Sequence, residues 1–316
     1  MVTPFEEDGG VDLAAAERIV EYIVKSGASV SILGTTGEAA SICLKDKVRL
    51  VECVVEQTAG RREVYAGIAD NCLANSIEMS RQFASLGAQV SVAHVPNYYP
   101  LSADDMAAYF ERLADKSDLP VMLYNIPVTT GMSIPVPVID RLSVHANIVG
   151  LKDSENNLER LQDALTRWKD REDFVYMMGC SVLSDKALSL GADGIVPGAG
   201  NIAPSLFVAL CRAATQGQAV QAKRLQACAD QISGMFQNGR ILSQSLPVLK
   251  ALMHLLGLCE THALPPFNPV GPETLDELKT QLPRIKTIMN ELQNAVPKTS
   301  RVPLDRIQDI QKKAGH

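Results

Sequence analysis

Apolar positions along the chain follow two patterns: short runs of apolar and β-branched residues, and longer segments with one apolar face. The short runs are typical of strands buried in a sheet, and the longer segments are typical of amphipathic helices. The predicted strands are residues 2–5, 28–33, 63–67, 89–94, 120–124, 147–152, 174–178 and 194–196. The predicted helices between and after them are residues 12–26, 44–58, 73–86, 102–116, 135–142, 158–168, 184–190 and 204–216.

Eight strand–helix units with short connections predict an α/β fold, namely a closed (β/α)8 TIM barrel. Parallel strands need helical crossovers, and closure of the barrel removes both edges of the sheet. A doubly wound open sheet is the alternative. After residue 217 the pattern contains helices only, at residues 219–237, 246–256 and 272–292, and at residues 302–313 within a polar tail. We therefore predict a barrel domain, residues 1–217, followed by a C-terminal helical domain, residues 218–316.

Composition limits the classes of partner. The chain has 316 residues, 46% of them hydrophobic, and a formal net charge of −6 that is spread without basic runs. This distribution argues against nucleic acid and anionic membranes as partners and favours a small-molecule substrate. No uncharged apolar run approaches the roughly 18 residues that would span a bilayer, and the acidic start lacks an apolar signal segment. We expect a cytoplasmic protein.

The seven cysteines, at positions 43, 53, 72, 180, 211, 228 and 259, are odd in number, lie among apolar residues and form no C-x-x-C pair. They are typical of reduced thiols in a cytosolic protein.

The strand at residues 147–152 ends in Lys152, which is unusual for a buried segment. Burying an ammonium without a partner is costly, so such a group finds an anion or favours its neutral form. A neutral lysine is a nucleophile toward ketones. The alternative is that Lys152 reaches solvent or pairs with Asp153.

Several polar residues follow the predicted strands at their carboxyl ends, where barrel active sites lie: Thr35, Thr36, Tyr98, Tyr99, Tyr124 and Lys152. Residues 34–38, Gly-Thr-Thr-Gly-Glu, form a turn ahead of a helix whose N–H groups and hydroxyls are suited to a carboxylate. Ordinary helix capping is the alternative for this turn. Tyr124 precedes a rigid proline turn and is a candidate for proton transfer, with a purely structural role as the alternative.

Three motifs together resemble one superfamily. Residues 34–38 (GTTGE), 124–127 (YNIP) and 150–153 (GLKD) occur in the order and spacing of the dihydrodipicolinate synthase and N-acetylneuraminate lyase family. The resemblance covers roughly residues 1–290. It implies a TIM barrel with a C-terminal helical domain, usually assembled as a tetramer of two tight dimers, and a class I aldolase that binds pyruvate as a Schiff base.

By this resemblance, Lys152 is the Schiff-base nucleophile and Tyr124 moves protons. Thr36, with the backbone at Gly37, binds the pyruvate carboxylate. Thr35 and Tyr98 match the family's relay to Tyr124, in which the neighbouring subunit supplies the tyrosine, and Tyr99 is an alternative for that role. The backbone carbonyl of Val196 matches the position that faces substrate. The protonated imine is itself the electron sink, so we expect no cofactor and no metal.

The aldehyde partner is less clearly indicated. Synthases of the family carry an arginine where this chain has Thr129, and sialic acid lyases carry an acidic pair where it has Cys180 and Ser181. Residues 124–131 and 261–266 resemble the 2-keto-3-deoxy sugar acid aldolases. We therefore expect an aldolase of a 2-oxo acid such as a 2-keto-3-deoxy sugar acid. The alternatives are dihydrodipicolinate synthase, 4-hydroxy-2-oxoglutarate aldolase and N-acetylneuraminate lyase.

Two other functions fit single features of the sequence. Residues 198–203 match G-x-G-x-x-A after a strand, as in nucleotide-binding folds, but no acidic residue follows about 20 positions later. A family member that only binds a 2-oxo acid is the second alternative, and the short first strand favours it. The five histidines, at positions 94, 145, 254, 262 and 316, show no metal-ligand spacing.

Overall fold

The computed structural model describes residues 1–295, without the side chains of residues 292–295, so the helix predicted at residues 302–313 lies outside the described part. The described residues form two compact units. Unit 1 contains residues 1–64 and 198–295, and unit 2 contains residues 65–197. The division into a barrel domain, residues 1–217, and a helical domain, residues 218–316, stays a prediction.

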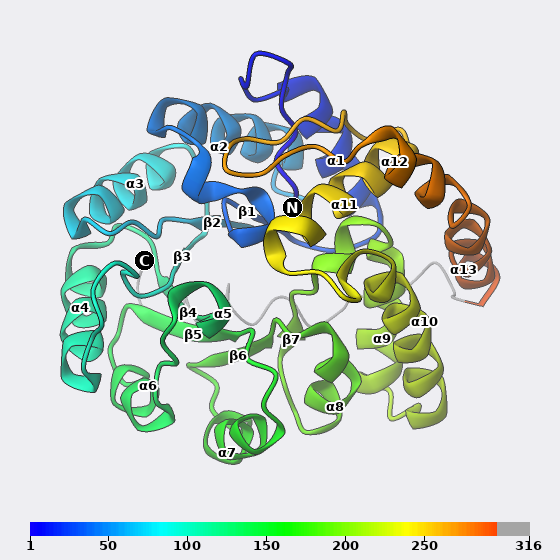
Figure 1. Ribbon diagram of the computed structural model, residues 1–316. Coiled ribbons are helices and arrows are strands. Elements are labelled where there is room, and N and C mark those ends of the chain that lie inside the picture. The colour runs from blue at the N-terminus through cyan, green and yellow to red at the C-terminus, as the bar shows by residue number, and fades with distance from the viewer. Residues whose placement is uncertain (296–316) are drawn as a thin grey trace. The chain divides into compact units, whose positions relative to one another are not determined.

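Strands and helices alternate along unit 2, as the apolar pattern predicts. The strands are parallel and pair in chain order: β2 (Val64–Gly67), β3 (Val90–Ala93), β4 (Val121–Asn125), β5 (Ile148–Asp153), β6 (Val175–Met178) and β7 (Gly194–Ile195). The helices are α3 (Leu73–Ser85), α4 (Ala103–Lys116), α5 (Pro127–Thr130), α6 (Val136–Leu142), α7 (Leu158–Trp168) and α8 (Ser184–Ser189). Figure 1 shows α3, α4, α6 and α7 on the outer side of these strands, as helical crossovers require.

The strands of unit 2 are buried on both faces, which explains their continuous apolar runs. Apolar side chains on the face opposite to the helices form one cluster, here called the strand cluster: Tyr65, Val90, Val92, Met122, Tyr124, Ile126, Val149, Val175 and Met177. Helix α4 begins at the predicted capping box, in which Ser102 Oγ accepts from Asp105 N at 3.1 Å. It buries Met106, Phe110 and Leu113, which lie on one helical face.

Strand β5 has one more residue than β4 near its start. Two consecutive residues of β4 pair with Ile148 and Gly150, so Val149 is the extra residue. Side chains normally alternate between the faces of a strand, and an extra residue shifts the alternation that follows. Val149 belongs to the strand cluster, and Lys152, three positions later, lies over Tyr124 of the same cluster. The register shift therefore lets both side chains occupy one face.

Unit 1 contains one short strand, β1 (Val30–Ile32), together with helices. These are α1 (Leu13–Lys25), α2 (Leu44–Thr58), α9 (Pro204–Thr215), α10 (Ala219–Gln237), α11 (Leu242–Leu255), α12 (Pro272–Lys279) and α13 (Leu282–Ala295). Figure 1 shows α9 and α10 side by side. The single helix predicted at residues 272–292 is wrong, because α12 ends at Lys279 and α13 begins at Leu282, with Pro283 in its first turn.

The strand predicted at residues 2–5 is also wrong. Phe5 makes only an isolated bridge, to Val11. The Met1 ammonium donates to the Ser31 carbonyl, and Val2 N donates to the Asn201 side chain at 2.8 Å. Since proline has no N–H, Pro4 cannot donate to a strand ladder. The apolar residues of this segment are buried without forming a regular strand.

Candidate active site

Lys152 and Tyr124 lie on adjacent strands and face each other. They pair directly in the register of β5 and β4. Lys152 Nζ lies 4.0 Å from the centroid of the Tyr124 ring, and the two residues are only 9% and 6% exposed. The face of an aromatic ring stabilises a cation without neutralising it. The Tyr124 ring therefore stabilises the position of the Lys152 amine but does not supply a counter-ion.

The two structural alternatives for Lys152 do not hold. The amine is buried, so it does not reach solvent. Asp153 does not pair with it, because the Asp153 carboxylate accepts from Arg160 Nε at 2.7 Å and from Asn125 Nδ2 at 2.8 Å. Among the described residues, no carboxylate lies within ion-pair distance of Lys152.

His94 is a neighbour of Tyr124 that the sequence analysis did not select. The two ring centroids are 6.3 Å apart in an edge-on arrangement. His94 Nδ1 lies 2.7 Å from the Val95 carbonyl, which can only accept, so Nδ1 carries the proton. Burial lowers the pKa of His94, and the nearby Lys152 charge lowers it further, against the opposing effect of that hydrogen bond. Its position at the end of a strand was the signal that could have identified it.

Apolar side chains surround the Lys152 and Tyr124 pair. Met177 of β6 pairs with Lys152, and Val196, which was expected to present a carbonyl to substrate, packs against the strand cluster. Thr129 lies exposed on α5, and its hydroxyl is 3.2 Å from the Ile126 carbonyl. Unit 2 thus brings Lys152, Tyr124 and Val196 together, whereas no contact within the described residues joins Thr129 to them.

Tyr98 and Tyr99 lie on the loop that follows β3. They are 76% and 70% exposed, and their rings meet edge to face at 5.0 Å. Asn71 Oδ1 fixes the loop by accepting from Asn97 N at 2.9 Å and from Tyr98 N at 3.3 Å. The relay from Tyr98 to Tyr124 stays a prediction.

Thr35, Thr36 and Gly37 belong to unit 1, where they form a single 3₁₀ turn. The turn ends at Glu38, whose φ of 57° lies in the left-handed region. A Cβ at Gly37 would lie 3.1 Å from the Met1 carbonyl and 3.2 Å from Thr3 Oγ1, so a side chain at this position has little room. The turn is therefore specified by close packing as well as by its sequence.

A buried ion pair stabilises this turn. Glu38 is 4% exposed and Lys250, on α11, is 1% exposed, and Lys250 Nζ donates to Glu38 Oε1. The same ammonium donates to the His262 carbonyl at 2.7 Å, while Glu38 Oε2 accepts from Leu264 N at 3.0 Å. Burial lowers the pKa of Lys250, and the charge of Glu38 opposes this shift. Sequence analysis missed this pair, since its two members are 212 positions apart.

The glycine-rich segment at residues 198–203 has a structural explanation. Residues Gly198–Asn201 form a 3₁₀ turn ahead of α9. Asn201 Nδ2 donates to the Gly198 carbonyl at 2.8 Å, and Asn201 Oδ1 accepts from Val2 N. The Asn201 side chain is thus used to hold the turn and the N-terminal segment together within unit 1.

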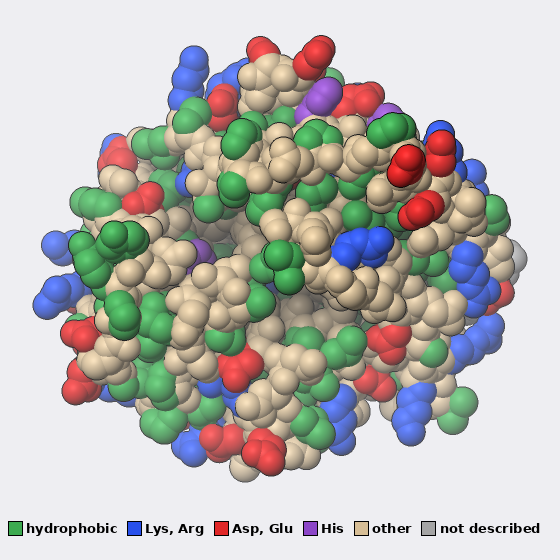
Figure 2. All heavy atoms as spheres, viewed as in Figure 1, with side chains coloured by type: hydrophobic (Ala, Val, Ile, Leu, Met, Phe, Trp, Pro, Cys, Tyr) green, Lys and Arg blue, Asp and Glu red, His purple; other side chains and the backbone are tan. Residues whose placement is uncertain are grey.

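Surface charge, ligand geometry and helix composition add three observations. On the face drawn in Figure 2, Lys and Arg side chains are interspersed with Asp and Glu side chains rather than gathered in patches of one sign. Within residues 1–295, no group of three or more His, Cys, Asp or Glu side chains is placed to hold a metal ion. None of the helices in that part of the chain is long and apolar enough to cross a membrane.

The sequence matches one family over nearly its whole length. The pattern of the dihydrodipicolinate synthetase family matches residues 1–309. A 4-hydroxy-tetrahydrodipicolinate synthase of Laribacter hongkongensis is 33% identical over 253 residues, which are 80% of this chain and 85% of that protein. A synthase of the same name from Xanthomonas campestris pv. campestris is 36% identical over 219 residues, 69% of this chain and 72% of that protein.

Solved structures agree with this match. Dihydrodipicolinate synthase from Bacteroides thetaiotaomicron has a TM-score of 0.85 at 28% identity, covering 90% of this chain and 96% of that one. YagE from Escherichia coli K12, a prophage protein of the dihydrodipicolinic acid synthase family solved in complex with pyruvate, has a TM-score of 0.84 at 28% identity and the same coverage. The predicted fold, a (β/α)8 TIM barrel with a helical C-terminal part, is thereby confirmed.

Proposed function

The chain belongs to the dihydrodipicolinate synthetase family, whose members are enzymes that form or cleave carbon–carbon bonds, and on this premise we propose that it is a pyruvate-dependent aldolase acting through a Schiff base at Lys152. One observation carries the proposal. The Lys152 amine is buried against the Tyr124 ring, and no carboxylate among the described residues pairs with it. A buried amine without a counter-ion is suited to attack a ketone.

In the proposed mechanism, the Lys152 nitrogen attacks the keto carbon of a 2-oxo acid and water leaves. The resulting imine is protonated and withdraws electrons from the adjacent carbon. In the cleavage direction, the carbon–carbon bond to that carbon breaks, the aldehyde leaves and an enamine remains. In the synthesis direction, the adjacent carbon loses a proton to give the enamine, which then forms a new bond to the aldehyde carbon. Tyr124 moves the protons, relayed by Thr35 and Tyr98. Thr36 and the Gly37 backbone hold the carboxylate.

For the aldehyde partner, we propose a hydroxyl-rich molecule, so that the 2-oxo acid is a 2-keto-3-deoxy sugar acid or a close relative. The support is Thr129, an exposed neutral side chain on α5, at the position where the synthases of the family carry an arginine. A second carboxylate on the substrate would lack a charged hydrogen-bonding partner there, a loss of about 1.5–3 kcal/mol. A hydroxyl group has no such requirement.

The second candidate is 4-hydroxy-tetrahydrodipicolinate synthase, which condenses pyruvate with aspartate semialdehyde. Relatives that are 33% and 36% identical carry that name. The two candidates share the Schiff base and differ only in the aldehyde.

Borohydride trapping tests the Schiff base. Incubation with pyruvate and borohydride should add one covalent group to Lys152, located by peptide mass spectrometry. Lys250 is an internal control, because its buried ammonium is held by Glu38 and should stay unmodified. Labelling of another lysine, or turnover by a Lys152→Ala variant, would overturn the assignment.

Kinetics with both aldehydes test the substrate. Cleavage of 2-keto-3-deoxygluconate should exceed, in kcat/KM, the condensation of pyruvate with aspartate semialdehyde. Thr129→Arg should shift this ratio toward the semialdehyde by roughly 10- to 150-fold, the range of a charge-assisted hydrogen bond. Efficient synthesis from aspartate semialdehyde by the unmodified protein would favour the second candidate.

A further inference from the structure

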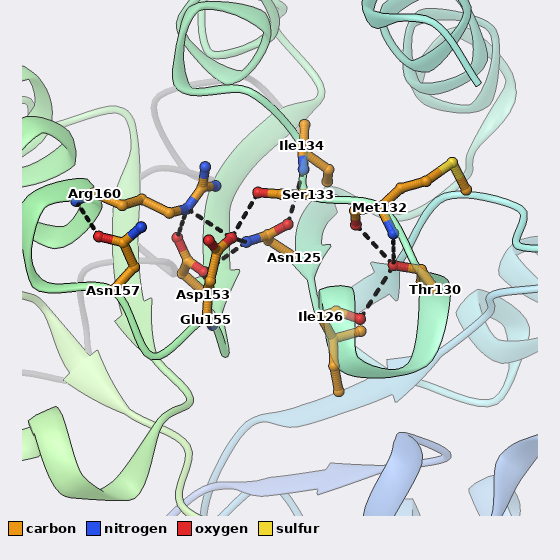
Figure 3. Close-up of polar contacts among 10 residues, drawn as sticks. All are labelled: Asn125, Ile126, Thr130, Met132, Ser133, Ile134, Asp153, Glu155, Asn157 and Arg160. Carbon is orange, nitrogen blue, oxygen red and sulfur yellow. Dashed lines mark hydrogen bonds and ion pairs between the residues drawn. The ribbon is translucent and has the colours of Figure 1, made fainter. Parts of the chain in front are cut away.

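Behind the pair of Tyr124 and Lys152 lies a second pair, formed by the next residue of each strand. Asn125 and Asp153 face each other in register, on the face of the strands that carries the helices. Both are buried, and Asn125 Nδ2 donates to Asp153 Oδ1 at 2.8 Å. Figure 3 shows this pair between Arg160 of α7 and the segment that follows β4. Arg160 Nε donates to Asp153 Oδ2 at 2.7 Å and thus completes the pair.

Glu155 connects this pair to residues 126–134, here called the α5 segment. Glu155 Oε2 accepts from Asn125 Nδ2 at 3.0 Å and from Ser133 Oγ at 2.6 Å, so it bonds to the residue that precedes the segment and to a residue near the segment's end (Figure 3). Asn125 Oδ1 accepts from Ile134 N at 2.9 Å, which closes the segment a second time.

Within the α5 segment the remaining polar groups bond locally. Thr130 Oγ1 lies 3.1 Å from the Ile126 carbonyl and 2.8 Å from the Met132 carbonyl. The segment is therefore a closed loop with its own internal bonds. Its side-chain links to β5 and the residues after it run through Glu155 and through Asn125, which bonds to Asp153. Thr129, the position proposed to face the aldehyde, is an exposed residue within this segment.

The charges favour Glu155 as an ionised acceptor. Arg160 Nε lies 3.6 Å from Glu155 Oε2, and the Arg160 side chain is only 8% exposed. Partial burial acts to raise the pKa of Glu155, but the hydrogen bonds from Ser133 and Asn125 and the charge of Arg160 together hold it below its ordinary value. Charge-assisted hydrogen bonds are roughly twice as strong as neutral ones, so a carboxylate holds the segment more firmly than an amide would.

We propose that Glu155 is a positioning residue that fixes the α5 segment on the strand carrying Lys152, and thereby sets which aldehyde the enzyme accepts. Glu155 touches neither the reacting atoms nor Lys152 and acts through Asn125 and Ser133. The proposal rests on the proposed function, because it assigns the α5 segment to the aldehyde side of the reaction. It predicts that loss of Glu155 affects the aldehyde and spares the pyruvate step.

The test compares Glu155→Ala, Glu155→Gln and the matched control Glu159→Ala. Glu159 is an exposed glutamate in the first turn of α7, so its replacement removes the same charge without touching the α5 segment. Three quantities are measured for each variant: the KM for the aldehyde or its retro-aldol precursor, the rate of borohydride trapping with pyruvate, and hydrogen exchange of the amides of residues 126–134.

Glu155→Ala should raise the KM on the aldehyde side about tenfold or more, the effect of losing a charged hydrogen bond, with the trapping rate within about twofold of the unmodified protein. The amides of residues 126–134 should exchange faster. Glu155→Gln should lie between Glu155→Ala and the unmodified protein, because its amide oxygen still accepts from Ser133 but carries no charge. Glu159→Ala should change none of the three quantities.

An unchanged KM in Glu155→Ala, or an equal loss in KM and trapping rate, would overturn the proposal, since the second result indicates general damage to the strands. Unchanged hydrogen exchange would overturn it as well. A different result would contradict the proposed function, namely that borohydride traps no pyruvate at Lys152 of the unmodified protein. In that case hydrogen exchange still decides whether Glu155 holds the segment.

Discussion

At the scale of single residues, the ring of Tyr124 and its hydroxyl can be considered separately. Its ring contributes to the strand cluster and supports the Lys152 amine, which a phenylalanine would do equally well. The hydroxyl is therefore the part of the side chain that packing does not require. Its contribution can be separated from that of the ring by a conservative replacement.

Tyr124→Phe should slow turnover by roughly 10²–10⁴, the range of a positioned acid–base group, while pyruvate affinity changes little. The packing of the ring against Lys152 persists, so borohydride trapping at Lys152 should still be detectable. Steady-state kinetics and trapping on the same preparation check this expectation. Near-normal turnover would remove Tyr124 from the mechanism.

His94 should make stability dependent on pH. Its pKa in the folded protein is lowered, so the unfolded chain binds a proton near the ordinary value of about 6.5, while the folded protein does not until lower pH. The contribution of neutral His94 to the free energy of unfolding is complete above about pH 6.5, and it is lost as the pH falls toward the pKa of His94 in the folded protein. Urea unfolding at pH 7.5, 6.5 and 5.5 measures it.

His94→Asn is the matched variant for this experiment, since asparagine does not titrate and retains a donor for the Val95 carbonyl. Its stability should fall less between pH 7.5 and 5.5 than that of the unmodified protein. Identical slopes would show that another group causes the dependence.

The sequence predicted Lys152 and Tyr124 correctly as neighbours at strand ends, because their motifs are local and strand ends of a parallel sheet meet at one edge. It did not identify the interactions of His94 or Glu155. Their significance depends on contacts with residues of other elements, and such contacts leave no periodic signal in the chain. Glu155 in particular is indistinguishable in sequence from a solvated glutamate.

At the scale of elements, the ion pair of Glu38 and Lys250 joins α11 to the Thr35–Gly37 turn. Glu38→Ala would leave a buried ammonium without its counter-ion, which costs about 3–5 kcal/mol. The turn should lose its support, so pyruvate affinity should fall together with stability. Urea unfolding and pyruvate titration of the trapping reaction measure the two effects.

The double variant Glu38→Leu, Lys250→Met separates charge from packing. Removing both charges should restore part of the stability, because a buried pair exchanged for apolar residues is often nearly neutral. Recovery stays incomplete, since the His262 carbonyl and the Leu264 N–H each lose a partner, about 1–3 kcal/mol apiece. A double variant no more stable than Glu38→Ala would assign the cost to packing instead.

Most strands and helices follow from the apolar pattern, and the errors have physical causes. Residues 2–5 have the composition of a strand, but Pro4 lacks a donor and the Val2 N–H bonds to a side chain. The extra residue in β5 was not predictable either, because a register shift is a property of two strands and each strand alone has a regular pattern.

At the scale of the whole molecule, the exposed rings of Tyr98 and Tyr99 bear on assembly. Exposed aromatic groups mark interaction surfaces, and the family resemblance predicts a dimer or tetramer in which this tyrosine reaches the neighbouring site. Replacing both rings, Tyr98→Ser with Tyr99→Ser, should weaken self-association in sedimentation experiments. If the double variant assembles to the same mass as the unmodified protein, the interface lies elsewhere.

Tyr98→Phe should lower turnover less than Tyr124→Phe and only in the assembled protein.

The fold class of the whole chain was predictable because eight apolar runs alternate with amphipathic segments, and few architectures accept that order. The choice of aldehyde was not. In the proposed function, that choice depends on Thr129 and on a segment held by contacts of Asn125, Ser133 and Glu155, and the last two residues lie outside the recognised motifs.

The extra residue at Val149 also affects how β5 responds to the deletion of one residue. The pairs Tyr124 with Lys152 and Asn125 with Asp153 fix the ladder at its carboxyl end, and the mismatch in strand length is absorbed before Gly150. An in-frame loss of the codon for Val149 would bring β4 and β5 to equal length and leave Lys152 opposite Tyr124. Loss of Val149 would thus keep the Lys152 side chain on the same face, whereas a one-residue deletion in a regular strand moves the following side chains to the other face.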